Sequence, residues 1–171
     1  LIKRENYKLA KIAIILGSDS DLPVLDKGFK IIEKLGLEFE LRILSAHRTH
    51  EAVESYIKSF DEKGIELVIA GAGKAAHLPG VIAAQTVKPV IGLPIRASLD
   101  GVDALYSIVQ MPGGIPVATV GINASDNAVL LAAQILALKY PEIGRKLEEH
   151  RIEMRDAVLE KDRNIQEKYN K

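Results

Sequence analysis

Three short segments combine small residues with side chains that could bind a phosphate or move a proton. Residues 17–21 read Gly-Ser-Asp-Ser-Asp. Small residues let backbone N–H groups approach an anion, and a helix N-terminus favours negative charge. Ser18 adds a hydroxyl donor, and Asp21 could accept hydrogen bonds from ribose hydroxyls. Helix capping by Ser and Asp is the alternative interpretation, and the segment lacks the Gly-Lys-Ser/Thr of a P-loop.

The second segment, residues 45–50, reads Ser-Ala-His-Arg-Thr-His. Arg48 suits a phosphate because its guanidinium presents a fork of N–H donors. His47 is a candidate acid and base, since imidazole titrates near neutral pH. A single histidine is more often structural or exposed, and we expect His50 to be a surface residue.

The third segment, residues 71–80, reads Gly-Ala-Gly-Lys-Ala-Ala-His-Leu-Pro-Gly. Its small side chains would form a smooth wall against which a flat substrate could lie, with His77 closing it. Close packing of a helix on a sheet is the alternative. Residues 110–116 carry no titratable group and are predicted as a turn rather than the floor of a site. The four histidines form no His-x-x-x-His pair and therefore no His-Glu-x-x-His motif, which argues against a zinc site.

These segments follow the strands of an alternating pattern of short apolar runs and amphipathic stretches. The predicted strands are residues 12–16, 39–44, 67–70, 90–93 and 116–121. The predicted helices are residues 23–35, 51–63, 78–86, 102–110 and 125–139, the last with Ser125 as its N-cap. Five β-α repeats predict one three-layer α/β domain with a parallel sheet. Ligands bind such sheets beyond the carboxyl ends of the strands, where the three segments lie.

The composition excludes several classes of function. The chain has 171 residues, which favours one compact domain. Its 23 basic and 23 acidic residues balance, which argues against nucleic-acid binding and leaves little charge to oppose association. Absence of cysteine excludes disulfides and thiolate chemistry. No apolar stretch approaches the length of a membrane span, so we expect no membrane partner and a cytoplasmic location.

The last residues differ from the rest. Residues 141–171 contain eight acidic and eight basic residues. Their thin apolar stripe at helical spacing consists of Ile143, Leu147, Met154, Val158 and Ile165. We therefore expect residues 1–140 to form the α/β domain and residues 141–171 to form a C-terminal helical arm. The arm could lie along its own domain or pack on a neighbouring subunit.

Five stretches, taken in order, carry a resemblance to a known family. They are residues 17–21, 45–49, 71–73 with 75–80, 107–119 and 127–136. In order and spacing, over roughly residues 11–140, the chain resembles the N5-carboxyaminoimidazole ribonucleotide mutase family of purine biosynthesis, the PurE proteins.

The resemblance implies a flavodoxin-like domain with a parallel sheet of about five strands, assembled into a homo-octamer without a metal or organic cofactor. It implies an isomerase that converts N5-carboxyaminoimidazole ribonucleotide to 4-carboxy-5-aminoimidazole ribonucleotide. The pathway partner would be the ATP-dependent synthetase that makes the substrate. By analogy with the family, His47 transfers the proton. The residues expected to bind substrate are Ser18, Asp21, Ser45, Arg48, Gly73, His77 and Leu78.

Two residues depart from the family pattern. The family commonly has Gly where this chain has Lys74, and Pro where it has His50. Lys74 could point to solvent or change the affinity for a carboxylate. A related branch carboxylates aminoimidazole ribonucleotide directly with free CO2, and this is the first alternative function. A non-catalytic flavodoxin-like module that binds a phosphorylated ligand is the second. A phosphoryl-receiver domain would need an acidic residue at the end of the third strand, where residues 69–71 supply none.

Overall fold

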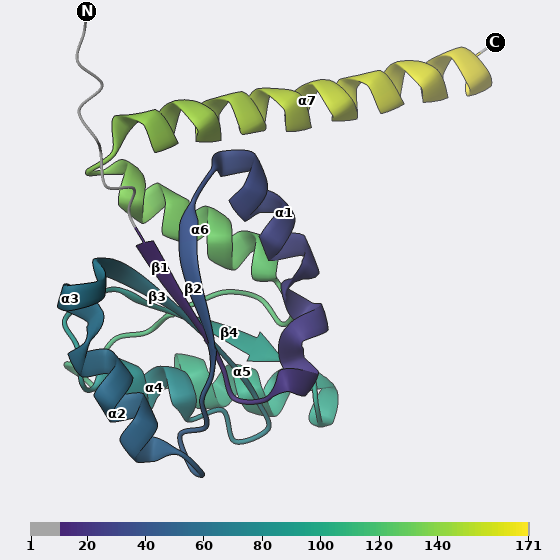
Figure 1. The fold of residues 1–171 in the computed structure, drawn as a ribbon. Coiled ribbons are helices and arrows are strands. Elements are labelled where there is room, and N and C mark those ends of the chain that lie inside the picture. The colour runs from purple at the N-terminus through teal and green to yellow at the C-terminus, as the bar shows by residue number, and fades with distance from the viewer. Residues whose placement is uncertain (1–10, 171) are drawn as a thin grey trace, which may run out of the picture. The chain divides into compact units, whose positions relative to one another are not determined.

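The computed structural model describes residues 11–170 and contains one parallel sheet of five strands in the order β2-β1-β3-β4-β5 (Figure 1). The strands are β1 (Lys11–Leu16), β2 (Glu38–Ile43), β3 (Ile65–Gly73), β4 (Val90–Ile95) and β5 (Ala118–Thr119). The side chains of β4 are all buried, as expected of a strand covered on both faces. This strand order is that of the flavodoxin-like fold, which confirms the predicted fold class.

Helices cover both faces of the sheet. The helices are α1 (Asp26–Leu35), α2 (His50–Lys58), α3 (Phe60–Lys63), α4 (Leu78–Ala83), α5 (Val102–Val109) and α6 (Ser125–Ala137). On one face, α2, α4 and α5 bury Val53, Ile82 and Ile108 in a cluster with alternate residues of β1, β3 and β4. On the other, α1 and the start of α6 pack together, with Gly28 so close to Val129 that a Cβ would lie 3.2 Å from it.

Two predicted helices are interrupted. Residues 19–25 form a 3-10 helix, η1 (Asp19–Leu25), and α1 starts only at Asp26. In this segment the Ser18 hydroxyl accepts a hydrogen bond from the Ser20 N–H, a local bond that favours turns and caps over a regular α-helix. The predicted helix 51–63 divides at Ser59, whose hydroxyl donates to the carbonyl oxygen of Tyr56 at 2.7 Å.

The prediction that β3 ends at residue 70 was wrong, because residues 71–73 continue the strand. They pair in register with residues 93–95 of β4. A Cβ on Gly71 would lie 2.6 Å from Leu16 Cδ2, so a larger residue here would force that buried side chain to move. The prediction that Ser125 caps α6 was also wrong. Its buried hydroxyl instead accepts from the Gly28 N–H at 3.1 Å and donates to the Val24 carbonyl at 2.6 Å.

The chain divides after Ala132 into two compact units, and the second contains the end of α6 and the helix α7 (Pro141–Tyr169). The predicted helical character of the C-terminal segment is thus confirmed. Met154, Val158 and Ile165 of its apolar stripe are exposed. Whether α7 lies on its own or a neighbouring subunit stays a prediction, as do the domain bounds 1–140 and 141–171. Within residues 11–170, no helix is both long and apolar enough to cross a membrane.

Candidate active site

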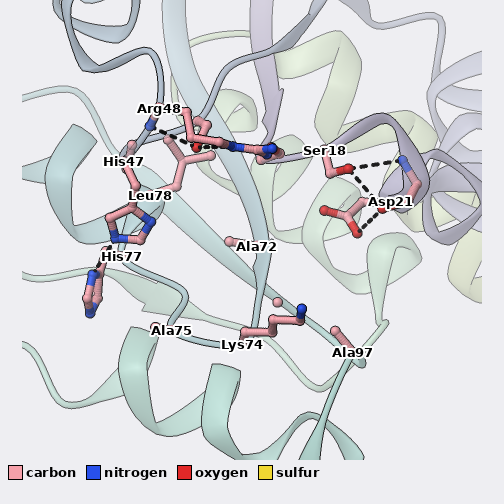
Figure 2. A pocket seen from close by; sticks show the side chains of 15 residues that line it. Ser18, Asp21, His47, Arg48, Ala72, Lys74, Ala75, His77, Leu78 and Ala97 are labelled. Carbon is pink, nitrogen blue, oxygen red and sulfur yellow. Dashed lines mark hydrogen bonds between the residues drawn. The ribbon is translucent and has the colours of Figure 1, made fainter.

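A cavity of about 550 Å³ opens at the carboxyl ends of β1 to β4. Its size suits a small-molecule ligand. All eight residues predicted for the site line this cavity: Ser18, Asp21, Ser45, His47, Arg48, Gly73, His77 and Leu78. Figure 2 shows that side chains from three separate segments converge on it. The sheet brings them together because parallel strands end at the same edge.

Arg48 lies between the ends of β1 and β2. Its Nη2 donates to the Gly17 carbonyl oxygen at 3.2 Å, and its Nε lies 3.4 Å from the Ser45 hydroxyl. The Thr49 hydroxyl donates to the carbonyl oxygen of Ser45 at 3.1 Å and accepts from its N–H at 2.9 Å, which closes the loop. These bonds orient the guanidinium, whose other N–H donors can bind an anion. Ser45 therefore positions Arg48 from within the cavity lining.

His47 and His77 form a direct pair. His47 Nε2 lies 2.7 Å from His77 Nδ1, and the rings meet edge to face at 74°. One of the two nitrogens must carry the shared proton, since a hydrogen bond between two imidazoles needs one donor and one acceptor. The bond fixes the orientation of both rings at the edge of the cavity (Figure 2). The pair can therefore hold and transfer a proton at a fixed place.

Ser18, Ser20 and Asp21 form a hydrogen-bonded group on the opposite side of the cavity in Figure 2. The hydroxyl oxygens of Ser18 and Ser20 lie 2.9 Å apart, within hydrogen-bond distance. Burial raises the pKa of the Asp21 carboxyl above its ordinary value, partly offset by a hydrogen bond from Ser20. Asp21 is half-buried and lines the cavity, so its carboxylate can accept hydrogen bonds from ligand hydroxyls.

Small residues form the wall between these groups. Ala72, Gly73, Ala75 and Ala97 all line the cavity. A Cβ on Gly73 would lie 2.9 Å from Ala97 Cβ, so the ends of β3 and β4 touch there. Ala97 also lines the cavity but was not predicted from the sequence. The carboxyl end of the fourth predicted strand was a signal that could have indicated it.

Lys74, His50 and residues 110–116 differ in how they lie relative to the cavity. Lys74 lines the cavity, whereas His50 is exposed and outside it, as expected. Residues 110–116 contain a turn and do not line this cavity, in agreement with the prediction. Among residues 11–170, no three His, Asp or Glu side chains come together where they could hold a metal ion.

Comparison with known proteins identifies the family that this chain resembles. The AIR carboxylase family matches residues 11–157. The chain is 52% identical over 160 residues to a Thermotoga maritima protein named N5-carboxyaminoimidazole ribonucleotide mutase, covering 93% of this chain and 94% of that one. It is 50% identical over 157 residues to a Candida albicans protein named phosphoribosylaminoimidazole carboxylase, covering 91% of this chain but 28% of that one.

Among solved structures, Treponema denticola PurE superposes with a TM-score of 0.83 at 31% identity, covering 91% of this chain and 98% of that one. The sheet, the cavity-lining segments and the family match all fall within residues 11–157. The chain belongs to the AIR carboxylase family.

Proposed function

We propose that the chain is an isomerase of de novo purine biosynthesis that converts N5-carboxyaminoimidazole ribonucleotide to 4-carboxy-5-aminoimidazole ribonucleotide. The observation that carries this function is the 52% identity to the Thermotoga maritima mutase along nearly the whole of both chains. The Candida albicans carboxylase matches this chain over little more than a quarter of its own length. Its name therefore describes a larger protein and does not favour the carboxylase alternative.

The reaction moves a carboxyl group and one proton. The bond from N5 to the carboxyl carbon breaks while N5 takes a proton, which leaves CO2 and an electron-rich aminoimidazole. C4 then attacks the CO2, and the C4 proton leaves to restore the aromatic ring. One proton is consumed and one released, so a single histidine can supply both transfers. We assign this role to His47, with His77 holding its ring at 2.7 Å.

The rest of the cavity serves positioning. We propose that Arg48, Ser18 and Asp21 bind the ribonucleotide, with Arg48 on the phosphate and Asp21 on the ribose. Ser45 orients Arg48 through the contact described above. Gly73 belongs to the small-residue wall, and Leu78 lines the same cavity; we propose that both confine the ring and the CO2. Holding CO2 beside C4 matters because fixed geometry can lower a barrier by several kcal/mol.

His47→Asn tests the proton transfer. We expect turnover to fall by about 10²- to 10⁴-fold, the usual contribution of a general acid–base group, while aminoimidazole ribonucleotide still binds. His50→Asn is the matched control, because His50 is three residues away, exposed and outside the cavity. Near wild-type turnover in His47→Asn would remove this residue from the mechanism.

Substrate feeding separates the mutase from the carboxylase. The enzyme is given N5-carboxyaminoimidazole ribonucleotide or aminoimidazole ribonucleotide, each with and without bicarbonate. We expect rapid conversion of the first without bicarbonate. If the enzyme converts only aminoimidazole ribonucleotide, and only when bicarbonate is present, it is the carboxylase.

We further propose a homo-octamer. Large apolar side chains lie exposed on the described part of the chain, among them Val87, Leu99 and Tyr106, which is typical of surfaces that associate. Light scattering should give the mass of eight chains of 18.7 kDa each. A monomer would contradict the proposal. The ATP-dependent synthetase as pathway partner and the cytoplasmic location stay predictions.

A further inference from the structure

Lys74 combines a strained backbone with a place in the cavity lining. Its φ is +55°, in the left-handed region that favours glycine. A residue with a Cβ is less stable in this conformation than glycine. It directly follows β3, whose last residue, Gly73, pairs with Ile95. In the part of the chain that the structure describes, the Lys74 ammonium has no hydrogen bond or ion pair. Because Lys74 is also exposed, neither packing nor an ion pair accounts for a lysine in this conformation.

The charges of the cavity give Lys74 a role. Among the described residues that line it, Asp21 is the only acidic one, and Arg48 and Lys74 carry the fixed positive charges. The formal charges of Asp21 and Arg48 sum to zero, so the net positive charge of the cavity lining comes from Lys74. A ribonucleotide with a phosphate and a carboxylate presents two anionic groups, and each can accept charge-assisted hydrogen bonds from a cationic side chain.

The two cations come from different strand ends. Arg48 follows β2, at the edge of the sheet, and Lys74 follows β3, near its centre. In Figure 2 they extend from opposite sides of the cavity, with Ala72 between them. If Arg48 binds the phosphate, Lys74 lies on the side of the small-residue wall, where the ring and its carboxyl group would be.

We infer that Lys74 is a specificity-determining residue whose ammonium binds the carboxylate of the substrate and product, and not their phosphate. This inference rests on the proposed function, since it requires a ribonucleotide that carries a ring carboxyl group. The ammonium favours ligands with that carboxylate over the same ribonucleotide without it.

The test compares two ligands that share the phosphate and differ in the carboxylate: 4-carboxy-5-aminoimidazole ribonucleotide and aminoimidazole ribonucleotide. Calorimetry measures the affinity of each for wild type, Lys74→Met and Lys74→Arg. Both variants keep a side chain with a Cβ at the strained position, so backbone strain is the same in all three. Lys30→Gln, which removes an exposed lysine outside the cavity, is the control.

We expect Lys74→Met to weaken binding of the carboxylated ligand about tenfold, the range of one hydrogen bond to a charged group. Binding of aminoimidazole ribonucleotide should change less than about twofold. In turnover, KM should rise by a similar factor while kcat changes little. Lys74→Arg should keep an affinity for the carboxylated ligand close to that of wild type, which a purely structural role would not predict.

Equal weakening for both ligands would overturn the inference in favour of phosphate binding, and unchanged affinity for both would overturn it altogether. Circular dichroism and Tm establish that each variant is folded, and Lys74→Gln replaces Lys74→Met if the latter does not fold. Failure of the proposed function is distinct. In that case the wild-type enzyme itself would not convert N5-carboxyaminoimidazole ribonucleotide, whatever the Lys74 variants do to the two affinities.

Discussion

Gly73→Ala places a methyl group where the end of β3 touches β4. The new Cβ would lie 2.9 Å from Ala97 Cβ and 3.0 Å from the carbonyl oxygen of Ile95. Carbon atoms pack best at about 3.5–4.0 Å, so the methyl group is roughly half an ångström too close. Neither neighbour is the end of a flexible side chain. The two strand ends must therefore separate, and with them the wall of the cavity.

The expected cost follows from this displacement. Overpacking of this kind destabilises a fold by about 1–3 kcal/mol, which for a chain of this length lowers Tm by roughly 3–9 °C. A shift of about 1 Å at a reacting group can reduce turnover about 100-fold, so half that shift should reduce kcat about tenfold.

Thermal unfolding and steady-state turnover, measured on the same preparations, check both numbers. Gly121→Ala is the control, since its Cβ would meet only Ala124 Cβ, at an ordinary distance of 3.6 Å, outside the cavity. The reasoning is refuted if Gly73→Ala keeps wild-type kcat and Tm. A fall in Tm with unchanged kcat would refute the link between this contact and the cavity wall.

Two further substitutions test the energetics around the site. Ser125→Ala leaves the buried Gly28 N–H, which lies in the first turn of α1 and has no partner within that helix, without its acceptor. It should cost about 3 kcal/mol and lower Tm by roughly 6–12 °C in calorimetry, and an unchanged Tm would contradict the role of this hydroxyl. For Asp21, burial raises the pKa in the folded state, so folding favours the protonated acid. That stability is complete below about pH 3.9 and is lost as pH rises through the raised pKa. Asp21→Asn should therefore raise Tm at pH 7, change it little near pH 3 and weaken ribonucleotide binding; a lower Tm at pH 7 would show that the sign is wrong.

The sequence alone determined the elements and the class of fold. Buried strands such as residues 12–16 are recognisable because a short β-branched apolar run that ends at glycine is typical of a strand covered on both faces. The segments after the strands stood out because serine, arginine and histidine among small residues are unusual at the edge of an apolar core. Their order along the chain was also sufficient for the resemblance to a family, since motif spacing is a local property of the sequence.

The tertiary structure decided where elements end and which side chains meet. Gly71 and Gly73 look like a loop in the sequence, yet pairing with β4 makes them strand, because hydrogen bonds to a distant segment outweigh the weak strand propensity of glycine. The contact of 2.7 Å between His47 and His77 joins residues 30 positions apart. Likewise, the strand order brings Ala97 to the cavity and determines the side of the cavity on which Lys74 lies. Such long-range pairings are set by packing across the whole sheet, which no single segment encodes.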